Sequence, residues 1–359
     1  MRYAFSENEM VIKGRIQDWS DYPAVPIYDT PISLREGFKA VYKKEMVWLP
    51  TIAEFQYFCP SCIPDVVARG AVMEGREYPE ELYGGPDMFG IPWEYEKMVG
   101  GSMVQRGYTL FDDANDWKEK VIFPDINAWD WEKSAKLNEK YLASGRANIL
   151  RFFSGCWFER LISFMGFEDA AVAIIDEEQK NAVKALFEKV TELHCKIVDK
   201  CCEYYDIDGF NVHDDWGSQK NPFFSNETAE EMIVPYMKML TDHIHSKGMI
   251  ADLHSCGSLG SQIENIVKAG WDSWAPQTMN PIEEYYKMYG DRIVLELVPP
   301  KFDWVTTSEE EQRKYAREFL DAHYDLNKTY RIGYYGTDNF TAAYMEELYR
   351  YSRIIYSRS

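Results

Sequence analysis

Apolar runs and amphipathic stretches alternate along most of this chain of 359 residues. Short apolar runs are typical of buried strands, whereas apolar residues that recur every three or four positions are typical of helices. Seven runs predict strands, at 46–52, 147–153, 209–214, 249–255, 271–276, 292–298 and 331–336. The helices predicted around them include 33–45, 130–144, 177–205, 227–248, 259–270, 282–290, 308–324 and 341–355.

Strands and helices that alternate in this way predict an α/β fold with a parallel sheet. Seven strands are clear, and the stretch from 100 to 175 leaves room for an eighth. We therefore expect a closed (β/α)8 barrel, the TIM barrel, formed as a single domain by residues 1–359. An open doubly wound sheet is the alternative, although no Gly-x-Gly-x-x-Gly follows the first strand, which disfavours its dinucleotide-binding form.

Residues 60–130 interrupt the regular pattern and are rich in glycine, proline and aromatic residues. A flexible linker would not carry Trp, Phe and Tyr throughout its length. We expect this segment to be an ordered insertion that forms a lid over the C-terminal rim of the barrel.

The charge and composition of the chain argue against some classes of binding partner. The formal net charge is −20, and no cluster of Lys and Arg is evident along the chain, so neither nucleic acid nor an anionic membrane is an expected partner. The first residues have no apolar signal-peptide core, and no run of 18 apolar residues occurs, which favours a cytoplasmic protein. Seven irregularly spaced cysteines are expected to be reduced thiols.

Polar residues follow several predicted strands in succession. In barrels of this kind the active site lies where the strands end, so these residues are candidates for binding and chemistry. They are His213, Asp214, Asp215, Trp216, His254, Cys256, Gln277, Glu296 and Asp338. Asp214 and Asp215 could be catalytic carboxylates or could cap the following loop, and Asp338 could be the N-cap of the last helix.

His254 and Cys256 are two residues apart at the end of a predicted strand. Because side chains alternate between the two faces of a strand, both should point the same way, about 3 to 4 Å apart if they bind one ion. An imidazole and a thiolate are typical zinc ligands, although a buried cysteine is more often a small apolar residue. A catalytic zinc usually has three protein ligands, so a third is needed.

The other cysteines give weaker signals. Cys59 and Cys62 form one Cys-x-x-Cys, which we interpret as structural because no second pair accompanies it. Cys156 follows a predicted strand and is held in reserve as a residue of the barrel mouth.

The stretches "VHDDWGSQKNPFFS" and "HSKGMIADLHSCGS" resemble the uroporphyrinogen decarboxylase superfamily, specifically its branch of corrinoid-dependent methyltransferases. "SLREGFKAVYKKE" and "GCWFERLISFMGFEDA" fit the same superfamily, and the resemblance covers about 30–356. It implies a (β/α)8 barrel, in agreement with the strand pattern.

Two departures from the family bear on function. The decarboxylases have an Arg-rich "RQAGR" segment after the first strand, but this chain reads "TIAEFQYFCPSC" there; Asp87 is similar in position to their essential aspartate. The thiol methyltransferases of the branch bind zinc through His-x-Cys and a distant second Cys, and no Cys follows Cys256. We predict that Glu296 replaces it, with Asp338 as the next candidate, since a carboxylate inside a barrel stays ionised only beside a cation.

The resemblance therefore implies a zinc-assisted methyltransferase of one-carbon metabolism. It would move a methyl group between a small molecule (an ether, amine or thiol) and a corrinoid, or methylcobamide, carried by a small partner protein. Asp214 and Asp215 would be catalytic, and Gln277, Trp216, Asp338 and Asp87 would contact substrate. The missing cysteine favours an oxygen or nitrogen methyl donor, and the aromatic lid would suit an aryl ether and so O-demethylation. The alternatives are a decarboxylase of a small carboxylated substrate and a non-catalytic partner of the corrinoid protein.

Overall fold

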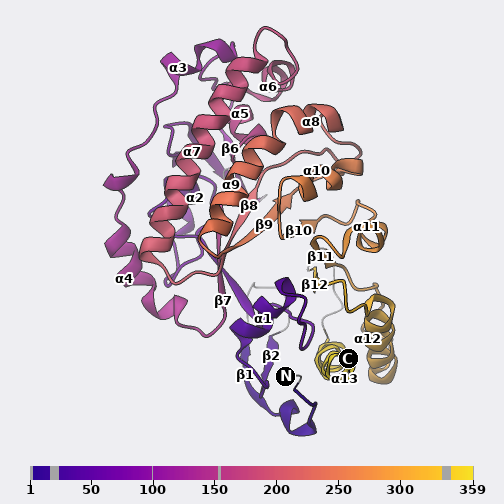
Figure 1. Cartoon of the computed structure of the whole chain (residues 1–359). Helices are drawn as coiled ribbons and strands as arrows, with labels where there is room; N and C mark the ends of the chain where they lie inside the picture. The colour runs from indigo at the N-terminus through magenta and orange to yellow at the C-terminus, as the bar shows by residue number, and fades with distance from the viewer. Residues whose placement is uncertain (1–2, 17–23, 99, 153–154, 334–340, 359) are drawn as a thin grey trace. The chain divides into compact units, whose positions relative to one another are not determined.

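The structure is a computed structural model that describes residues 3–16, 24–98, 100–152, 155–333 and 341–358 (Figure 1). Within these ranges, seven strands share one sheet with helices around it, which confirms the α/β class and the barrel-type sheet predicted from the sequence. The strands are β3 (Phe55–Phe58), β7 (Ala147–Phe152), β8 (Gly209–His213), β9 (Ile250–Ser255), β10 (Ser273–Pro276), β11 (Val294–Leu297) and β12 (Tyr330–Ile332). The described residues contain no eighth strand of this sheet.

The backbone packs as two compact units, each described here by itself. Unit 1 comprises Met1–Gln56, Gly145–Ala147 and Asp272–Ser359, and unit 2 comprises Tyr57–Ser144 and Asn148–Trp271.

In unit 2, β7, β8 and β9 are parallel neighbours, with Gly209 opposite both Ile149 and Ile250. Every side chain of β7 and β9 is buried, as expected of strands covered on both faces. The helices of this unit are α2 (Pro64–Ala68), α3 (Trp117–Lys120), α4 (Trp131–Leu142), α5 (Phe158–Met165), α6 (Phe167–Ala173), α7 (Lys180–Tyr204), α8 (Asn226–Met232), α9 (Val234–Ser246) and α10 (Ile263–Lys268).

The segment 60–130 is ordered within unit 2. It carries a three-stranded antiparallel sheet of β4 (Gly85–Pro86), β5 (Pro92–Glu96) and β6 (Gly101–Val104). Short 3-10 turns at Glu80–Leu82, Ala114–Asp116 and Ile126–Ala128 complete it. Four of its aromatic residues, Phe89, Trp93, Phe111 and Trp117, are buried, so aromatic packing stabilises this loop-rich segment.

The predicted helix 227–248 is two helices, α8 and α9, that meet at Ile233. Pro235 lies in the first turn of α9, where its missing N–H is tolerated. Inside one continuous helix the same proline would remove a hydrogen bond and collide with the preceding turn. The apolar periodicity therefore identified the helical residues but not the break.

In unit 1, β10, β11 and β12 are parallel neighbours. The helices of this unit are α1 (Leu34–Tyr42), α11 (Ile282–Tyr289), α12 (Glu309–His323) and α13 (Ala342–Arg358), and β1 (Ile12–Ile16) pairs antiparallel with β2 (Val25–Tyr28). Ser33 and Glu36 form a capping box at the start of α1, within the helix predicted at 33–45. Trp48, Tyr28 and Tyr349 pack together at the centre of an apolar cluster.

The prediction of a first strand at 46–52 is wrong, because that strand is β3, at Phe55–Phe58. Pro50 cannot donate a ladder hydrogen bond, and the segment turns instead. Glu54 fixes the turn by accepting hydrogen bonds from the Thr51 backbone N–H at 2.5 Å and from Trp48 Nε1 at 2.9 Å. None of the helices in the described ranges has the length and apolar character needed to cross a membrane.

Candidate metal centre

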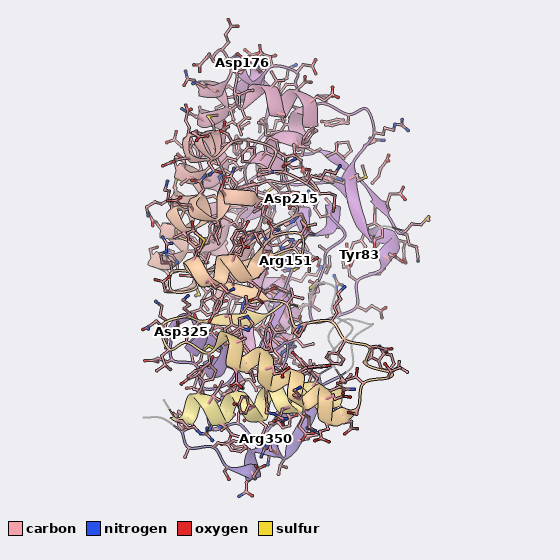
Figure 2. The ribbon with its side chains drawn as sticks, turned by 90° about the vertical axis from the view of Figure 1, so that its right-hand side faces the viewer. Tyr83, Arg151, Asp176, Asp215, Asp325 and Arg350 are labelled. Atoms are coloured by element: carbon pink, nitrogen blue, oxygen red, sulfur yellow. The ribbon has the colours of Figure 1, made fainter. Side chains whose placement is uncertain are left out.

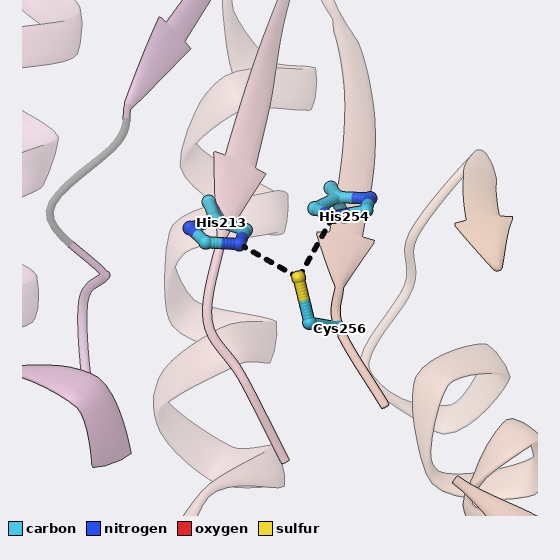
Figure 3. A group of neighbouring side chains, drawn as sticks. All are labelled: His213, His254 and Cys256. Atoms are coloured by element: carbon cyan, nitrogen blue, oxygen red, sulfur yellow. Dashed lines mark hydrogen bonds between the residues drawn. The ribbon is translucent and has the colours of Figure 1, made fainter. Parts of the chain in front are cut away.

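Two histidines lie at the same level on β8 and β9. His213 is the last residue of β8 and is the register partner of His254. Their rings stack with centroids 5.0 Å apart and planes inclined by 14°. Cys256 follows β9 directly, and its Sγ lies 3.3 Å from His254 Nε2 and 3.7 Å from His213 Nε2 (Figure 3). We call these three side chains the His-His-Cys cluster.

The spacing of the cluster suits zinc. Its three ligand atoms all lie within 4.8 Å of one another. Around a tetrahedral zinc with bonds of about 2.0 to 2.3 Å, ligand atoms are separated by roughly 3.5 Å, and the observed nitrogen–sulfur distances of 3.3 and 3.7 Å lie on either side of that value. The predicted convergence of His254 and Cys256 is confirmed, whereas their role as metal ligands stays a prediction.

Sequence reasoning included His213 among the strand-end candidates but did not predict it as a metal ligand, although a signal was present. "VHDD" and "LHSC" each place a histidine at the end of an apolar strand, and the two strands are consecutive in the α/β pattern. Neighbouring parallel strands place their ends at the same edge of the sheet. Pairing the two stretches would have brought His213 beside His254.

Asp215 connects the two strand ends. Its Oδ1 accepts a hydrogen bond of 2.6 Å from the Cys256 backbone N–H and lies 3.0 Å from His213 Nε2. Burial opposes ionisation of Asp215, but its interactions with His213 and with the Cys256 amide outweigh that effect and lower its pKa. Asp215 is partly exposed and is labelled in Figure 2. It therefore presents a carboxylate beside the cluster.

Glu159, which sequence reasoning also missed, approaches His213 from the other side. Its Oε2 lies 3.2 Å from His213 Nδ1, and its Oε1 accepts a hydrogen bond of 2.9 Å from Arg69. Burial alone would lower the pKa of His213, but the charges and hydrogen-bonding groups of Glu159, Asp215 and Cys256 raise it to about 10. A carboxylate beside the non-ligating nitrogen is the usual partner of a metal-binding histidine.

Asp214 holds the first turn of α5. Its carboxylate is fully buried and accepts hydrogen bonds from four successive backbone N–H groups, those of Cys156, Trp157, Phe158 and Glu159, at 3.1 to 3.3 Å. Trp216 Nε1 donates a fifth hydrogen bond at 2.9 Å. Burial and the charge of Glu159 raise the pKa of Asp214 to about 7, against the effect of these donors. These contacts position Glu159, while a direct catalytic role for Asp214 stays a prediction.

Two glycines let the loops after β8 and β9 touch. A Cβ on Gly257 would lie 2.1 Å from the carbonyl oxygen of Gly217, and Gly257 has a φ of +85° that favours glycine. The Ser258 N–H donates a 2.7 Å hydrogen bond to the Ser218 carbonyl next to this crossing. The backbone itself therefore fixes Cys256 against Asp215.

A pocket of about 580 Å3 within unit 2 includes Glu159 and Asp215 in its lining. Residues 102–108 of the inserted segment form another part of the lining. Aromatic side chains are prominent in it, and they are Trp93, Tyr108, Phe167 and Phe223. Arg69 lies over the Trp93 ring, 4.6 Å from its centre. The pocket thus reaches the two carboxylates beside His213, while the three residues of the cluster are not among its lining residues.

Trp216 and Asp87, both predicted to contact substrate, are buried within unit 2. Asp87 lies 2.5 Å from Arg160 Nη1 and accepts a hydrogen bond of 3.1 Å from Trp93 Nε1. Arg160 also pairs with Asp65, so one buried guanidinium serves two carboxylates. Asp87 thereby anchors Trp93, and its predicted contact with substrate stays a prediction.

Three other predicted site residues lie outside unit 2. Glu296, on β11, pairs with Arg331 of β12 at 3.0 Å, and its role as a metal ligand stays a prediction. The backbone carbonyl of Gln277 accepts hydrogen bonds from Asn280. Asp338 lies outside the described residues.

Fold and site together define an α/β protein whose parallel strands carry a His-His-Cys cluster where β8 and β9 end. The structure is similar to that of a methyltransferase from Methanosarcina mazei, with a TM-score of 0.60 and 13% sequence identity over 90% of this chain and 98% of that one. At this identity the likeness shows a shared fold.

A xylose isomerase-like TIM barrel protein from Mycobacterium smegmatis, solved in complex with magnesium, matches over 65% of this chain and 80% of its own, with 13% identity. Its TM-score of 0.34 is too low to carry an argument. No protein-family model and no curated protein sequence matches the chain.

Proposed function

We propose that this protein is a zinc-dependent methyltransferase that moves a methyl group between a small molecule and a corrinoid carried by a small partner protein. The observation that carries the proposal is the convergence of His213 Nε2, His254 Nε2 and Cys256 Sγ within unit 2. The fold shared with a protein named a methyltransferase supports it, and so does the resemblance of the sequence to corrinoid-dependent methyltransferases.

The cluster would hold zinc through two imidazoles and one thiolate, which leaves a fourth position open, as in catalytic zinc sites. Bound zinc supplies a Lewis acid that polarises a substrate heteroatom. We propose His213 as the third protein ligand, and we keep Glu296 as the alternative predicted from the sequence. One sulfur ligand rather than two makes the site less selective for thiols and favours an oxygen-containing methyl donor.

The residues around the His-His-Cys cluster would orient its ligands and the substrate and would transfer protons. Glu159, held by Arg69, would keep the proton of His213 on Nδ1 and leave Nε2 free to bind. Asp215 lies beside the cluster and lines the pocket, so its carboxylate would orient the substrate or transfer a proton to or from its heteroatom. The aromatic lining would hold the ring of an aryl methyl ether and keep water away.

Metal content tests the proposal directly. Protein purified without chelators is expected to contain one zinc per chain by elemental analysis, and Cys256→Ser and His213→Ala should each contain clearly less, because each removes one proposed ligand. His243→Ala is the matched control, because His243 is a partly exposed residue of α9 paired with Asp199 in the same unit. Equal zinc in wild type, His213→Ala and Cys256→Ser would overturn the assignment.

Activity is measured with cob(I)alamin as the methyl acceptor and a methoxybenzene as the donor, by chromatography of the phenol released. We expect phenol from the wild type and none from Cys256→Ser. Release of carbon dioxide from carboxylated aromatic substrates, without any demethylation, would favour the decarboxylase instead. Zinc in His213→Ala together with its loss in Glu296→Gln would transfer the third-ligand role to Glu296.

A further inference from the structure

A pocket of about 680 Å3 within unit 1 is lined by more basic than acidic residues, whereas the whole chain has a net negative charge. Six of its lining residues are Lys or Arg and three are Asp or Glu, whereas the whole chain has 39 basic and 59 acidic residues. The six are Arg35, Lys39, Lys43, Lys44, Lys328 and Arg353. We call this cavity the basic pocket. Four of the six lie close together in the sequence, within residues 35–44, and the other two lie near the C-terminal end of the chain.

One wall of the basic pocket is a stripe along α1. Arg35, Lys39 and Lys43 are four residues apart, so they project from the same face of the helix. Lys43 is the C-cap of α1 and is exposed, and no hydrogen bond or ion pair of its ammonium group is found among the described residues. The stripe therefore gives this wall of the basic pocket three cationic side chains.

The chain turns sharply at the end of this stripe. Lys44 has a φ of +56°, the only positive φ of a non-glycine residue in the described ranges. Such a conformation is unfavourable for a residue other than glycine. The turn is fixed by a hydrogen bond of 2.6 Å from Lys44 Nζ to the Asp291 carbonyl, and this bond uses one of three ammonium protons.

The loop before β12 supplies another cation to the basic pocket, Lys328, which is half-buried. Its ammonium donates a 2.7 Å hydrogen bond to the Lys287 carbonyl. Asp325 of the same loop, labelled in Figure 2, is one of the three acidic lining residues. Arg353, by contrast, is fully buried and bonded to Glu9 at 2.7 Å, so it acts as part of the wall.

Apolar side chains line the basic pocket as well, and they are Ile32, Ala40, Met46, Val47, Leu326 and Tyr356. A concave site of several hundred Å3 with apolar walls and a few converging charges is typical of small-molecule binding. Lys328 is half-buried and loses part of its hydration, and a bound polyanion would compensate for that loss.

We propose that the basic pocket binds a phosphorylated small molecule of nucleotide size, with its phosphates on the lysines of α1 and its ring on the apolar wall. None of the lining residues belongs to the His-His-Cys cluster, so this proposal does not depend on the proposed methyl transfer.

Calorimetric titration with ADP and with inorganic pyrophosphate, at 50 mM and 200 mM salt, tests the proposal. We expect saturable ADP binding at one site per chain, weaker at the higher salt and tighter than that of pyrophosphate. Lys39→Gln/Lys43→Gln should weaken ADP binding by about tenfold or more, because it removes two charge-assisted contacts. Lys301→Gln/Lys314→Gln is the matched control, since it makes the same change in net charge in unit 1 outside the basic pocket.

Three results would overturn the proposal. The first is no saturable ADP binding by the wild type at 50 mM salt, and the second is equal weakening in the control variant, which would indicate a diffuse charge effect. The third is pyrophosphate binding as tightly as ADP, which would leave the apolar wall without a role. If the double variant is misfolded by circular dichroism, Lys43→Gln alone replaces it, because Lys43 is exposed and its loss should not disturb packing.

Discussion

Both units bury polar groups on strands, but they satisfy those groups in different ways. In unit 1, Glu296 and Arg331 are register partners on adjacent strands and pair at 3.0 Å. In unit 2, the strand ends carry two imidazoles and a thiol, with the carboxylates Glu159 and Asp215 on either side of His213. The charge argument that suggested Glu296 as a ligand required only a nearby cation, and Arg331 is such a cation. A buried carboxylate thus indicates a cation without indicating a metal.

Breaking the ion pair of unit 1 should have the largest effect. Arg331→Met would leave Glu296 buried without its charge partner, and removal of one partner of a buried pair costs about 3 to 5 kcal/mol of stability. Urea unfolding measures this loss.

Adding Glu296→Gln to Arg331→Met provides the control, because the double variant carries no unpaired charge. It should recover much of the lost stability. If Arg331→Met is as stable as the wild type, Arg331 does not offset the cost of burying the Glu296 charge. The proposed difference between the two units would then be wrong.

Weakening the support of the cluster in unit 2 should have an intermediate effect. Glu159→Gln removes the carboxylate beside His213 Nδ1, and loss of such a partner lowers metal affinity by about 10- to 100-fold. Competition with a chromophoric zinc chelator measures the affinity. Glu168→Gln, an exposed acid of α6, should bind zinc as the wild type does. Unchanged affinity in Glu159→Gln would mean that Glu159 does not support a ligand.

His194, a second buried histidine of unit 2, has no carboxylate partner among the described residues and can be compared with His213. Burial lowers the pKa of His194 to about 4; its Nδ1 contacts the Val190 carbonyl at 2.8 Å, and its Nε2 has no partner in the described residues. His194 therefore binds a proton more readily in the unfolded state than in the folded state. Its contribution to the free energy of unfolding is fully present above about pH 6.5 and decreases as the pH falls toward 4.

His194→Gln should remove this acid sensitivity. Between pH 7.5 and pH 5 the wild type should lose about 2 kcal/mol more than the variant, as measured by urea unfolding at both pH values. His243→Gln, which alters a partly exposed histidine, should lose as much as the wild type. An equal loss in all three proteins would show that His194 is not the group responsible.

The sequence predicted the strand–helix order and the position of His254 beside Cys256, because periodicity and alternation are local properties. It did not identify His213 as a neighbour of the pair, since the register of β8 against β9 follows from their packing. Nor did it show that Asp214 and Asp215, adjacent in sequence, separate into a helix anchor and a pocket residue. The break at Pro235 and the shift of the first strand to β3 each followed from one proline that interrupts an otherwise regular pattern.

The crossing of Gly217 and Gly257 bears on how sites of this kind can be recognised in other sequences. Ligand residues can be exchanged among His, Cys, Asp and Glu as a site adapts to another metal. No side chain fits between these two loops, whatever the ligands are. A search for "DDWG" and "HSCG" at the ends of consecutive strands, in which the final glycines are fixed and the other positions vary, would therefore find distant relatives in which the residues of the His-His-Cys cluster have changed.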